Sequence, residues 1–148
     1  MQIQSLLSPE RTHCNVTASS KRQALEILAN IIAQAVPSLD ADDLLRRFLA
    51  RERLGSTGIG HGIAIPHCRV TQCDTAIGAL ISLQSPIEFD SIDTQPVDIL
   101  FAMLVPDEAH NEHLQNLAAL ANVLGHEDFR QHLRNATDNH TLYQAAIS

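Results

Sequence analysis

Aromatic side chains are scarce in this sequence: they make up 3% of its residues, and tryptophan is absent. Proteins that stack the bases of single-stranded nucleic acid need such side chains, so this class is disfavoured. Basic residues are also few, with 10 Lys and Arg against 17 Asp and Glu and a net charge of −7. DNA binding needs a cationic surface, whereas this charge balance predicts a basic protein partner.

Cysteines are equally few, and the three present (Cys14, Cys68 and Cys73) lack the paired spacing of a metal site. No stretch approaches the roughly 18 apolar residues of a membrane span. Pro9 and Arg11 interrupt the apolar residues near the N-terminus, where a signal peptide would need its apolar core. We therefore expect reduced thiols, a cytoplasmic location and no membrane insertion.

Hydrophobic periodicity predicts a single α/β domain over residues 1–148, with a mixed sheet flanked by helices on both faces. Near the N-terminus, Ile3, Leu6 and Leu7 are expected to anchor the chain on the core. Capping residues Ser20 and Asp40 predict the starts of two helices, and Ser85-Pro86 predicts a turn. The expected strands are 13–16, 63–65, 75–83 and 97–105, and the expected later helices are 113–125, 128–134 and 141–147.

The densest motif is the run from Arg51 to His67, RERLGSTGIGHGIAIPH. Its four glycines allow backbone N–H groups to approach an anion closely. Pro66 is expected to stop the short strand before it and to present His67 at a strand end. An imidazole beside such a loop indicates a phosphoryl-accepting nucleophile. The alternative interpretation is a structural or solvated histidine after a flexible connector.

This run resembles the signature of the phosphotransferase-system (PTS) enzyme IIA family of the fructose–mannitol type (type 2), in which "GSTGIG-GIAIPH" is the motif. The resemblance continues along nearly all of the chain and is nearest to the nitrogen-regulatory branch. It implies the PTS EIIA type-2 fold and phosphorylation of His67 by a histidine phosphocarrier protein (HPr/NPr-like), without a cofactor. It also implies a phosphorylation state that controls regulatory target proteins. The alternative is a sugar-specific enzyme IIA that passes phosphate to an enzyme IIB.

Two further residues are predicted at the site. The family keeps a second active-site histidine in an "EHL" context, which falls here on His113, with His110 as a rival. A neutral imidazole in the first turn of a helix can donate to a phosphoryl oxygen. The family also keeps an arginine before the glycine loop, which matches Arg51, with Arg53 as the alternative. A guanidinium can hold phosphoryl oxygens bidentately.

Two other classes of protein fit the sequence less well. Eight histidines and three cysteines suggest a metal-binding or metal-dependent hydrolytic domain, but the sequence has no His-x-x-x-His or Cys-x-x-Cys spacing. A nucleotide-binding module is disfavoured because no G-x-x-x-x-G-K-[ST] occurs. Within the motif, His61 and Cys68 stand where family members often carry Asn and Gly. Neither change alters the candidate nucleophile, and both are interpreted as tolerated variation.

Overall fold

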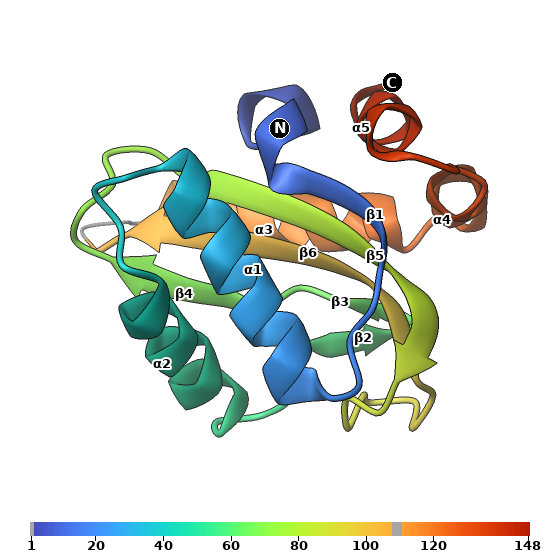
Figure 1. Ribbon diagram of the computed structural model, residues 1–148, viewed down its shortest axis with the longest axis horizontal. Coiled ribbons are helices and arrows are strands. Elements are labelled where there is room, and N and C mark those ends of the chain that lie inside the picture. The colour runs from blue at the N-terminus through green and yellow to red at the C-terminus, as the bar shows by residue number, and fades with distance from the viewer. Residues whose placement is uncertain (1, 108–110) are drawn as a thin grey trace.

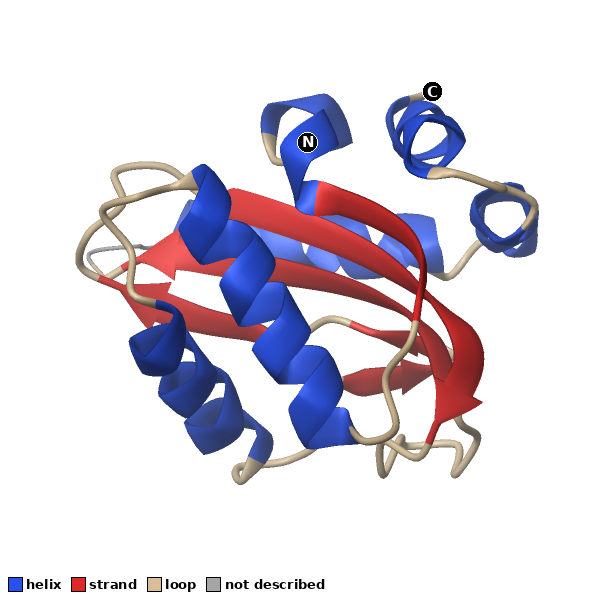
Figure 2. Ribbon diagram, in the orientation of Figure 1, coloured by secondary structure: helices blue, strands red, loops and turns tan. Residues whose placement is uncertain are grey.

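A six-stranded mixed sheet forms the centre of the protein (Figures 1 and 2). The computed structural model describes residues 2–107 and 111–148, the latter without the side chains of residues 111–114. Along the sheet the order is β1-β5-β6-β3-β2, and β4 pairs with β6 on the same edge as β3. The strands are β1 (Thr12–Val16), β2 (Gly58–Gly60), β3 (Ile63–Ala64), β4 (His67–Val70), β5 (Ile77–Ile87) and β6 (Val97–Pro106).

Strand β6 is the central strand, as its nearly uninterrupted apolar sequence predicts. It pairs antiparallel with β5 on one side and parallel with both β3 and β4 on the other. Its residues alternate between two cores: Leu100, Ala102 and Leu104 face one cluster, whereas Ile99 and Phe101 face the other. Because both faces of the strand are covered, both must be apolar.

Helices cover both faces of the sheet (Figure 2), so the predicted fold class is confirmed. Helices α1 (Lys21–Ala35) and α2 (Ala41–Glu52) lie side by side on one face. The other face packs against α3 (Asn111–Leu124), α4 (Glu127–Arg134), α5 (Asn139–Ile147) and the short turn η1 (Ile3–Ser5). A second short turn, η2 (Pro9–Arg11), precedes β1 and contacts α1, α5 and β5. No helix in the described part of the chain is long and apolar enough to cross a bilayer.

The predicted helix starts are confirmed by their capping hydrogen bonds. The Ser20 hydroxyl accepts from the backbone N–H of Gln23, and the Asp40 carboxylate accepts from that of Asp43. These bonds satisfy donors that have no partner inside the helix. The expected N-terminal anchors, Ile3, Leu6 and Leu7, are all buried.

Two local predictions are wrong. Ser85-Pro86 does not form a turn but lies inside β5, which continues to Ile87 across a shift in its register with β6. The shift in register accommodates Pro86, because proline has no N–H to donate and the ladder is already interrupted there. His67 does not directly follow the strand before Pro66; it opens β4, and residues 65 and 66 separate it from the end of β3 at Ala64.

Candidate functional site

His67 is the first residue of β4 and is half-buried, with Met103 of β6 as its parallel partner. The adjacent residue, Cys68, packs into the core beneath α1 and α2. Since successive side chains of a strand point to opposite faces, the imidazole of His67 lies on the α3 side of the sheet. Pro66, whose carbonyl accepts from the N–H of Met103 at 2.9 Å, fixes the chain just before the histidine.

The hydrogen bonds of the imidazole define its tautomer. Nδ1 lies 2.8 Å from the carbonyl oxygen of Ile65, so Nδ1 carries the proton and donates it there. Nε2 lies 3.3 Å from Nε of Arg51, whose N–H donates to the ring nitrogen. Nε2 therefore holds a lone pair, which is what a nucleophilic nitrogen requires.

Burial lowers the pKa of His67 below its ordinary value. The hydrogen bond to Ile65 opposes this shift, the charge of Arg51 adds to it, and the charge of Glu52 weakly opposes it. Burial and a nearby cation both disfavour the imidazolium. At neutral pH the ring is thus neutral, with its lone pair directed at Arg51.

Two hollows meet at His67. The larger, about 460 Å³, is lined by Arg47, Ala50, Arg51, Leu54, His67, Cys68, Arg69, Val105 and Leu117. A second, about 320 Å³, lies beside the glycine-rich segment and shares Arg51, His67 and Leu117 with the first. The histidine is therefore accessible from the surface while its ring is held by two hydrogen bonds.

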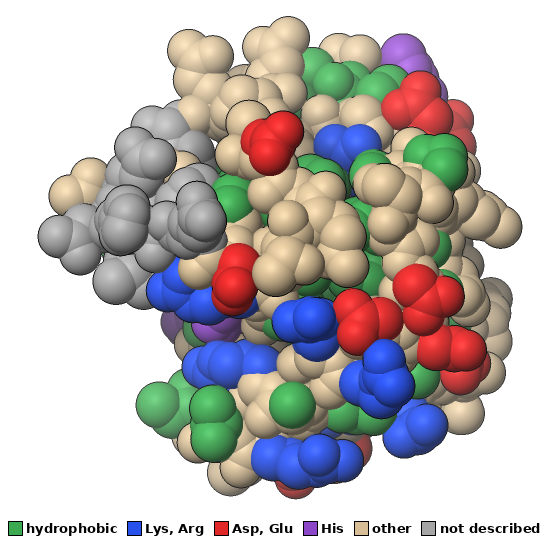
Figure 3. Space-filling model, turned by 90° about the vertical axis from the view of Figure 1, so that its left-hand side faces the viewer, with side chains coloured by type: hydrophobic (Ala, Val, Ile, Leu, Met, Phe, Trp, Pro, Cys, Tyr) green, Lys and Arg blue, Asp and Glu red, His purple; other side chains and the backbone are tan. Residues whose placement is uncertain are grey.

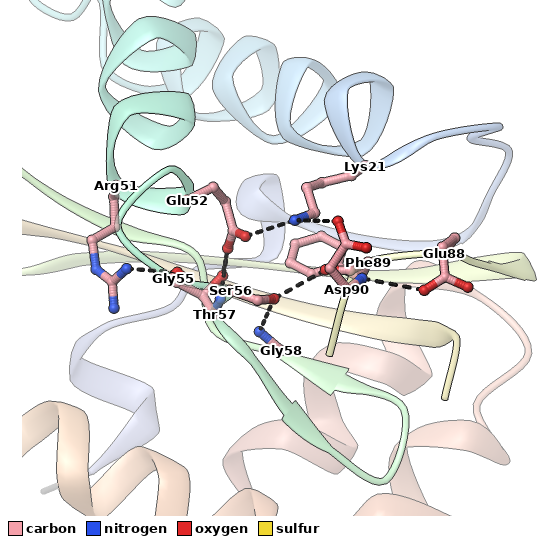
Figure 4. A network of polar contacts seen from close by, with 10 residues as sticks. All are labelled: Lys21, Arg51, Glu52, Gly55, Ser56, Thr57, Gly58, Glu88, Phe89 and Asp90. Carbon is pink, nitrogen blue, oxygen red and sulfur yellow. Dashed lines mark hydrogen bonds and ion pairs between the residues drawn. The ribbon is translucent and has the colours of Figure 1, made fainter. Parts of the chain in front are cut away.

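A network at the end of α2 holds the segment that carries the motif (Figure 4). The Glu52 side chain is 5% exposed, and its carboxylate accepts from the backbone N–H of Thr57 at 2.7 Å and from the Thr57 hydroxyl. It also pairs with Nζ of Lys21 at 2.9 Å. The Thr57 carbonyl then accepts from the N–H of Ile65, whose own carbonyl holds Nδ1 of His67. Glu52 is thus linked to the catalytic candidate through a chain of hydrogen bonds.

Three amides of the glycine-rich segment are bonded within the protein and are therefore not offered to an anion in this structure. The N–H groups of Thr57, Gly58 and His61 donate to Glu52, the Ser56 hydroxyl and Asp93 respectively. The glycines instead permit a tight β2–β3 hairpin with close neighbours.

A Cβ at Gly58 would lie 2.1 Å from the Ser91 hydroxyl oxygen, and one at Gly62 would lie 2.5 Å from Nη2 of Arg134. Between β2 and β3, His61 adopts a left-handed conformation with φ of 59°. His and Asn tolerate this region better than most residues do.

The predicted arginine lies at the histidine. Besides its contact with His67, Arg51 donates through Nη1 to the carbonyl of Gly55 at 2.8 Å. Arg53 is the exposed C-cap of α2, and its side chain makes no hydrogen bond or ion pair with the described residues. Geometry therefore favours Arg51 for contact with the nucleophile.

The second predicted histidine is placed only by its backbone. His113 lies in α3, and its side chain is outside the described residues, as is the whole of its rival His110. Leu117, one helical turn after position 113, lines both hollows around His67.

Cys68 also lines the larger hollow, where burial raises the pKa of its thiol to about 12. A thiol so protonated is a poor nucleophile. Among the described residues there is no group of three or more His, Cys, Asp or Glu side chains that could hold a metal ion. Sequence reasoning missed Glu52, Thr57 and Lys21, since nothing in their spacing indicates that they meet.

The chain matches a known protein family over nearly its whole length. Residues 5–147 match the model of the family described as "Phosphoenolpyruvate-dependent sugar phosphotransferase system, EIIA 2". The chain belongs to this family. A fructose-specific EIIA component of the PTS from Haloferax volcanii is 36% identical over 124 residues, which are 84% of this chain and 80% of that protein.

Within the family, the chain is a homologue of the nitrogen regulatory proteins. One from Pseudomonas aeruginosa is 43% identical over 147 residues, which cover 99% of this chain and 96% of the relative. The crystal structure of the nitrogen regulatory protein IIA-Ntr from Neisseria meningitidis superposes with a TM-score of 0.89 at 31% identity. That match covers 97% of this chain and 98% of the other.

Proposed function

We propose that the protein is a nitrogen-regulatory phosphocarrier that accepts a phosphoryl group on Nε2 of His67 from a histidine phosphocarrier protein. The observation that carries this proposal is the pair of contacts on the imidazole. Ile65 holds the proton on Nδ1, and Arg51 points an N–H at the lone pair of Nε2. A nucleophile and a phosphoryl-binding cation are thus already side by side.

In the transfer step, the lone pair of Nε2 forms a bond to phosphorus as the donor's N–P bond breaks. The electron pair of that bond returns to the donor imidazole, and the proton on Nδ1 of His67 stays in place. Charge spreads over three equatorial oxygens in a loose, roughly in-line transition state. Arg51 already points toward the position that the phosphoryl group would occupy, and its guanidinium can donate to these oxygens.

His113 is proposed to orient and stabilise the phosphoryl group without ever carrying it. Two features support the assignment: the family's "EHL" context and the position of residue 113 in the first turn of α3. A helix N-terminus favours a neutral imidazole and also attracts anions. Leu117, four residues later, contacts the same hollows as His67.

The regulatory role is preferred to sugar transport because two relatives that are 43% and 42% identical over nearly the whole chain are nitrogen regulatory proteins. In this role the phosphorylation state of His67 controls other proteins in the cytoplasm, where thiols such as the three free cysteines stay reduced. The fructose-specific relative supports the alternative function, in which the phosphoryl group passes to an enzyme IIB and then to a sugar. Transfer from the phosphorylated protein to a fructose-type enzyme IIB at a rate matching donation from HPr would favour the alternative.

Phosphorylation by phosphoenolpyruvate, enzyme I and the histidine phosphocarrier protein tests the proposal directly. The adduct should be labile in acid and stable in base, and peptide mapping should place it on His67. His67→Ala should abolish it, while His61→Asn, which tolerates the left-handed backbone of that position, should leave it intact. Stoichiometric labelling of His67→Ala would refute the assignment.

A further inference from the structure

A depression lies between α1 and α2, the two helices that pack side by side on one face of the sheet. Its volume is about 540 Å³, within the range of sites that hold small molecules. Leu45, Leu49 and Ala50 supply its apolar lining. Among the described lining residues, it shares only Ala50 with the larger hollow at His67. The depression is therefore a second concave region, separate from the candidate nucleophile.

Two arginines that line this depression have no partner among the described residues. Arg22 and Arg53 are exposed, and neither side chain makes a hydrogen bond or ion pair there. Each directly follows a member of the Lys21–Glu52 pair, whose 2.9 Å contact joins the start of α1 to the end of α2 (Figure 4). The two unpaired guanidinium groups therefore line the same end of the depression.

The other charged lining residues do not neutralise this end. Asp42, the acidic lining residue, lies in the first turn of α2, whereas Arg53 is the C-cap of that helix. Arg46 lines the depression too, but it is paired with Asp43 at 3.0 Å. Figure 3 views the side on which α2 lies in Figure 1, and basic side chains gather over the lower half of this face, beside apolar ones.

Arg22 is also in a position that does not favour its own helix. It lies in the first turn of α1, which contains no acidic residue, and a cation there is opposed by the helix dipole. Lys21, in the same turn, is accounted for by its ion pair with Glu52. Glu26 has the spacing for an ion pair with Arg22 along the helix, yet the pair does not form. Residues that break a local rule in this way are expected at functional sites.

We propose that this depression binds a phosphate-bearing small molecule with a flat or apolar ring. The phosphate lies between the guanidinium groups of Arg22 and Arg53, which present several planar donors each. The ring covers Leu49 and Ala50. The missing P-loop motif does not oppose this site, because side chains and not loop amides hold the phosphate. The site goes beyond the proposed function and does not depend on it.

Isothermal titration calorimetry with ADP, pyrophosphate and adenosine tests the proposal on the full chain. ADP supplies both phosphate and ring, pyrophosphate supplies charge alone, and adenosine supplies the ring alone. ADP should bind more tightly than pyrophosphate, and adenosine should bind at least about tenfold more weakly than ADP, because a hydrogen-bonded charge contributes more than an exposed apolar contact. The affinity for ADP should fall as salt is raised, since exposed charges are screened.

Four variants locate the site. Arg22→Gln and Arg53→Gln should each raise the Kd of ADP about three- to tenfold, because each removes a charged donor that is partly screened by solvent. Gln4→Glu is the matched control: it also changes the net charge by −1, and it is exposed in η1, away from α2. Neither Gln4→Glu nor Arg51→Gln should change the Kd of ADP by more than about twofold.

The absence of ADP binding, or a Kd unchanged in both Arg22→Gln and Arg53→Gln, would overturn the proposal. A loss of affinity in Arg51→Gln alone would also overturn it, because ADP would then occupy the hollow at His67. If a tetraglutamate peptide displaces ADP at a lower concentration than pyrophosphate does, the site fits an acidic protein segment and the proposed ligand class is wrong.

Labelling of His67 by phosphoramidate, a small phosphoryl donor without a protein surface, is measured on the same Arg22→Gln protein. The labelling rate should match that of the unmodified protein, since Arg22 lines the depression and not the hollow at His67. If the unmodified protein is not labelled, the proposed function fails while the ADP result stands. The failure of the one is therefore distinguishable from the failure of the other.

Discussion

Replacing Glu52 should disturb both the stability of the protein and the reactivity of His67, although Glu52 does not touch the imidazole. Its carboxylate, 5% exposed, accepts two hydrogen bonds from Thr57 and one from Lys21. Glu52→Ala would leave the buried N–H of Thr57 without an acceptor. It would also leave Lys21, which lies 4.8 Å above the ring of Phe89, with a weaker partner.

The expected loss in the free energy of unfolding depends on the partners that Lys21 and Thr57 retain. Removing one partner of a buried ion pair costs about 3–5 kcal/mol. The Lys21 side chain is 22% exposed and keeps Asp90 at 3.5 Å, so the lower end applies. We expect Glu52→Ala to lose about 3 kcal/mol. Glu52→Gln keeps the shape and an acceptor for Thr57 but loses charge assistance, so about 1–2 kcal/mol is expected.

Urea unfolding measures the loss, and labelling by phosphoramidate measures reactivity. In Glu52→Gln the pKa of His67, followed by NMR titration, should fall below that of the unmodified protein, because the Glu52 charge raises it. Labelling should slow as the Thr57–Ile65 connection to the imidazole loosens. Glu26→Gln, the same change at an exposed position of α1, is the control and should stay within about 0.5 kcal/mol.

A double-mutant cycle with Thr57→Val isolates the contribution of the Glu52–Thr57 contact to stability. If Glu52 acts through Thr57, the double variant should lose less than the sum of the single losses. A Glu52→Gln protein as stable as the unmodified one, with an unshifted pKa of His67, would refute the reasoning. Strict additivity in the cycle would show that Thr57 is not the route.

Three further predictions concern the transfer itself. Arg51→Ala and His113→Ala should each slow labelling of His67 by about 10²–10³. If both residues hold the same phosphoryl group, the loss in the double variant should be less than the sum of the single losses. A wild-type rate in either variant would exclude that residue from this role. Transfer from purified phosphorylated carrier should persist in excess EDTA; loss of transfer that Mg²⁺ restores would contradict this. Because the pKa of His67 is lowered, labelling by phosphoramidate should be flat above pH ~6.5 and fall only below it. Because the pKa of His67 is lowered on folding, the stability that the neutral ring contributes is present above pH ~6.5 and is lost as the pH falls through the lowered pKa. A pKa of His67 above ~6.5 in the folded protein would contradict both the labelling and the stability prediction.

Features encoded by local sequence were predictable. Ser20 and Asp40 cap their helices because each side chain reaches a backbone N–H three residues away, a contact that needs no tertiary structure. Strand β6 was predictable because a continuous apolar run must be covered on both faces. The candidate nucleophile followed from the motif, whose residues are contiguous.

Contacts between distant segments were not predictable in the same way. Glu52 and Lys21 are 31 residues apart, and nothing in the local sequence around either residue indicates that they pair. Pro86 indicated a turn because proline usually interrupts a strand. Here β5 absorbs it in a shift of register with β6, which depends on the partner strand.

The glycine motif marks the segment beside His67, but its glycines have a packing role that the sequence did not indicate. Glycines near a nucleophile suggested an amide cradle, yet Gly58 and Gly62 are needed because Ser91 and Arg134 leave no room for a Cβ. In the proposed transfer, the side chain of Arg51 supplies positive charge for the phosphoryl group. In the last turn of α2, Glu52 points inward and fixes the segment through Thr57, while the neighbouring Arg51 points to His67. A side chain can follow the phosphoryl group as it arrives and leaves, which a fixed amide cannot, and a carrier must release what it binds.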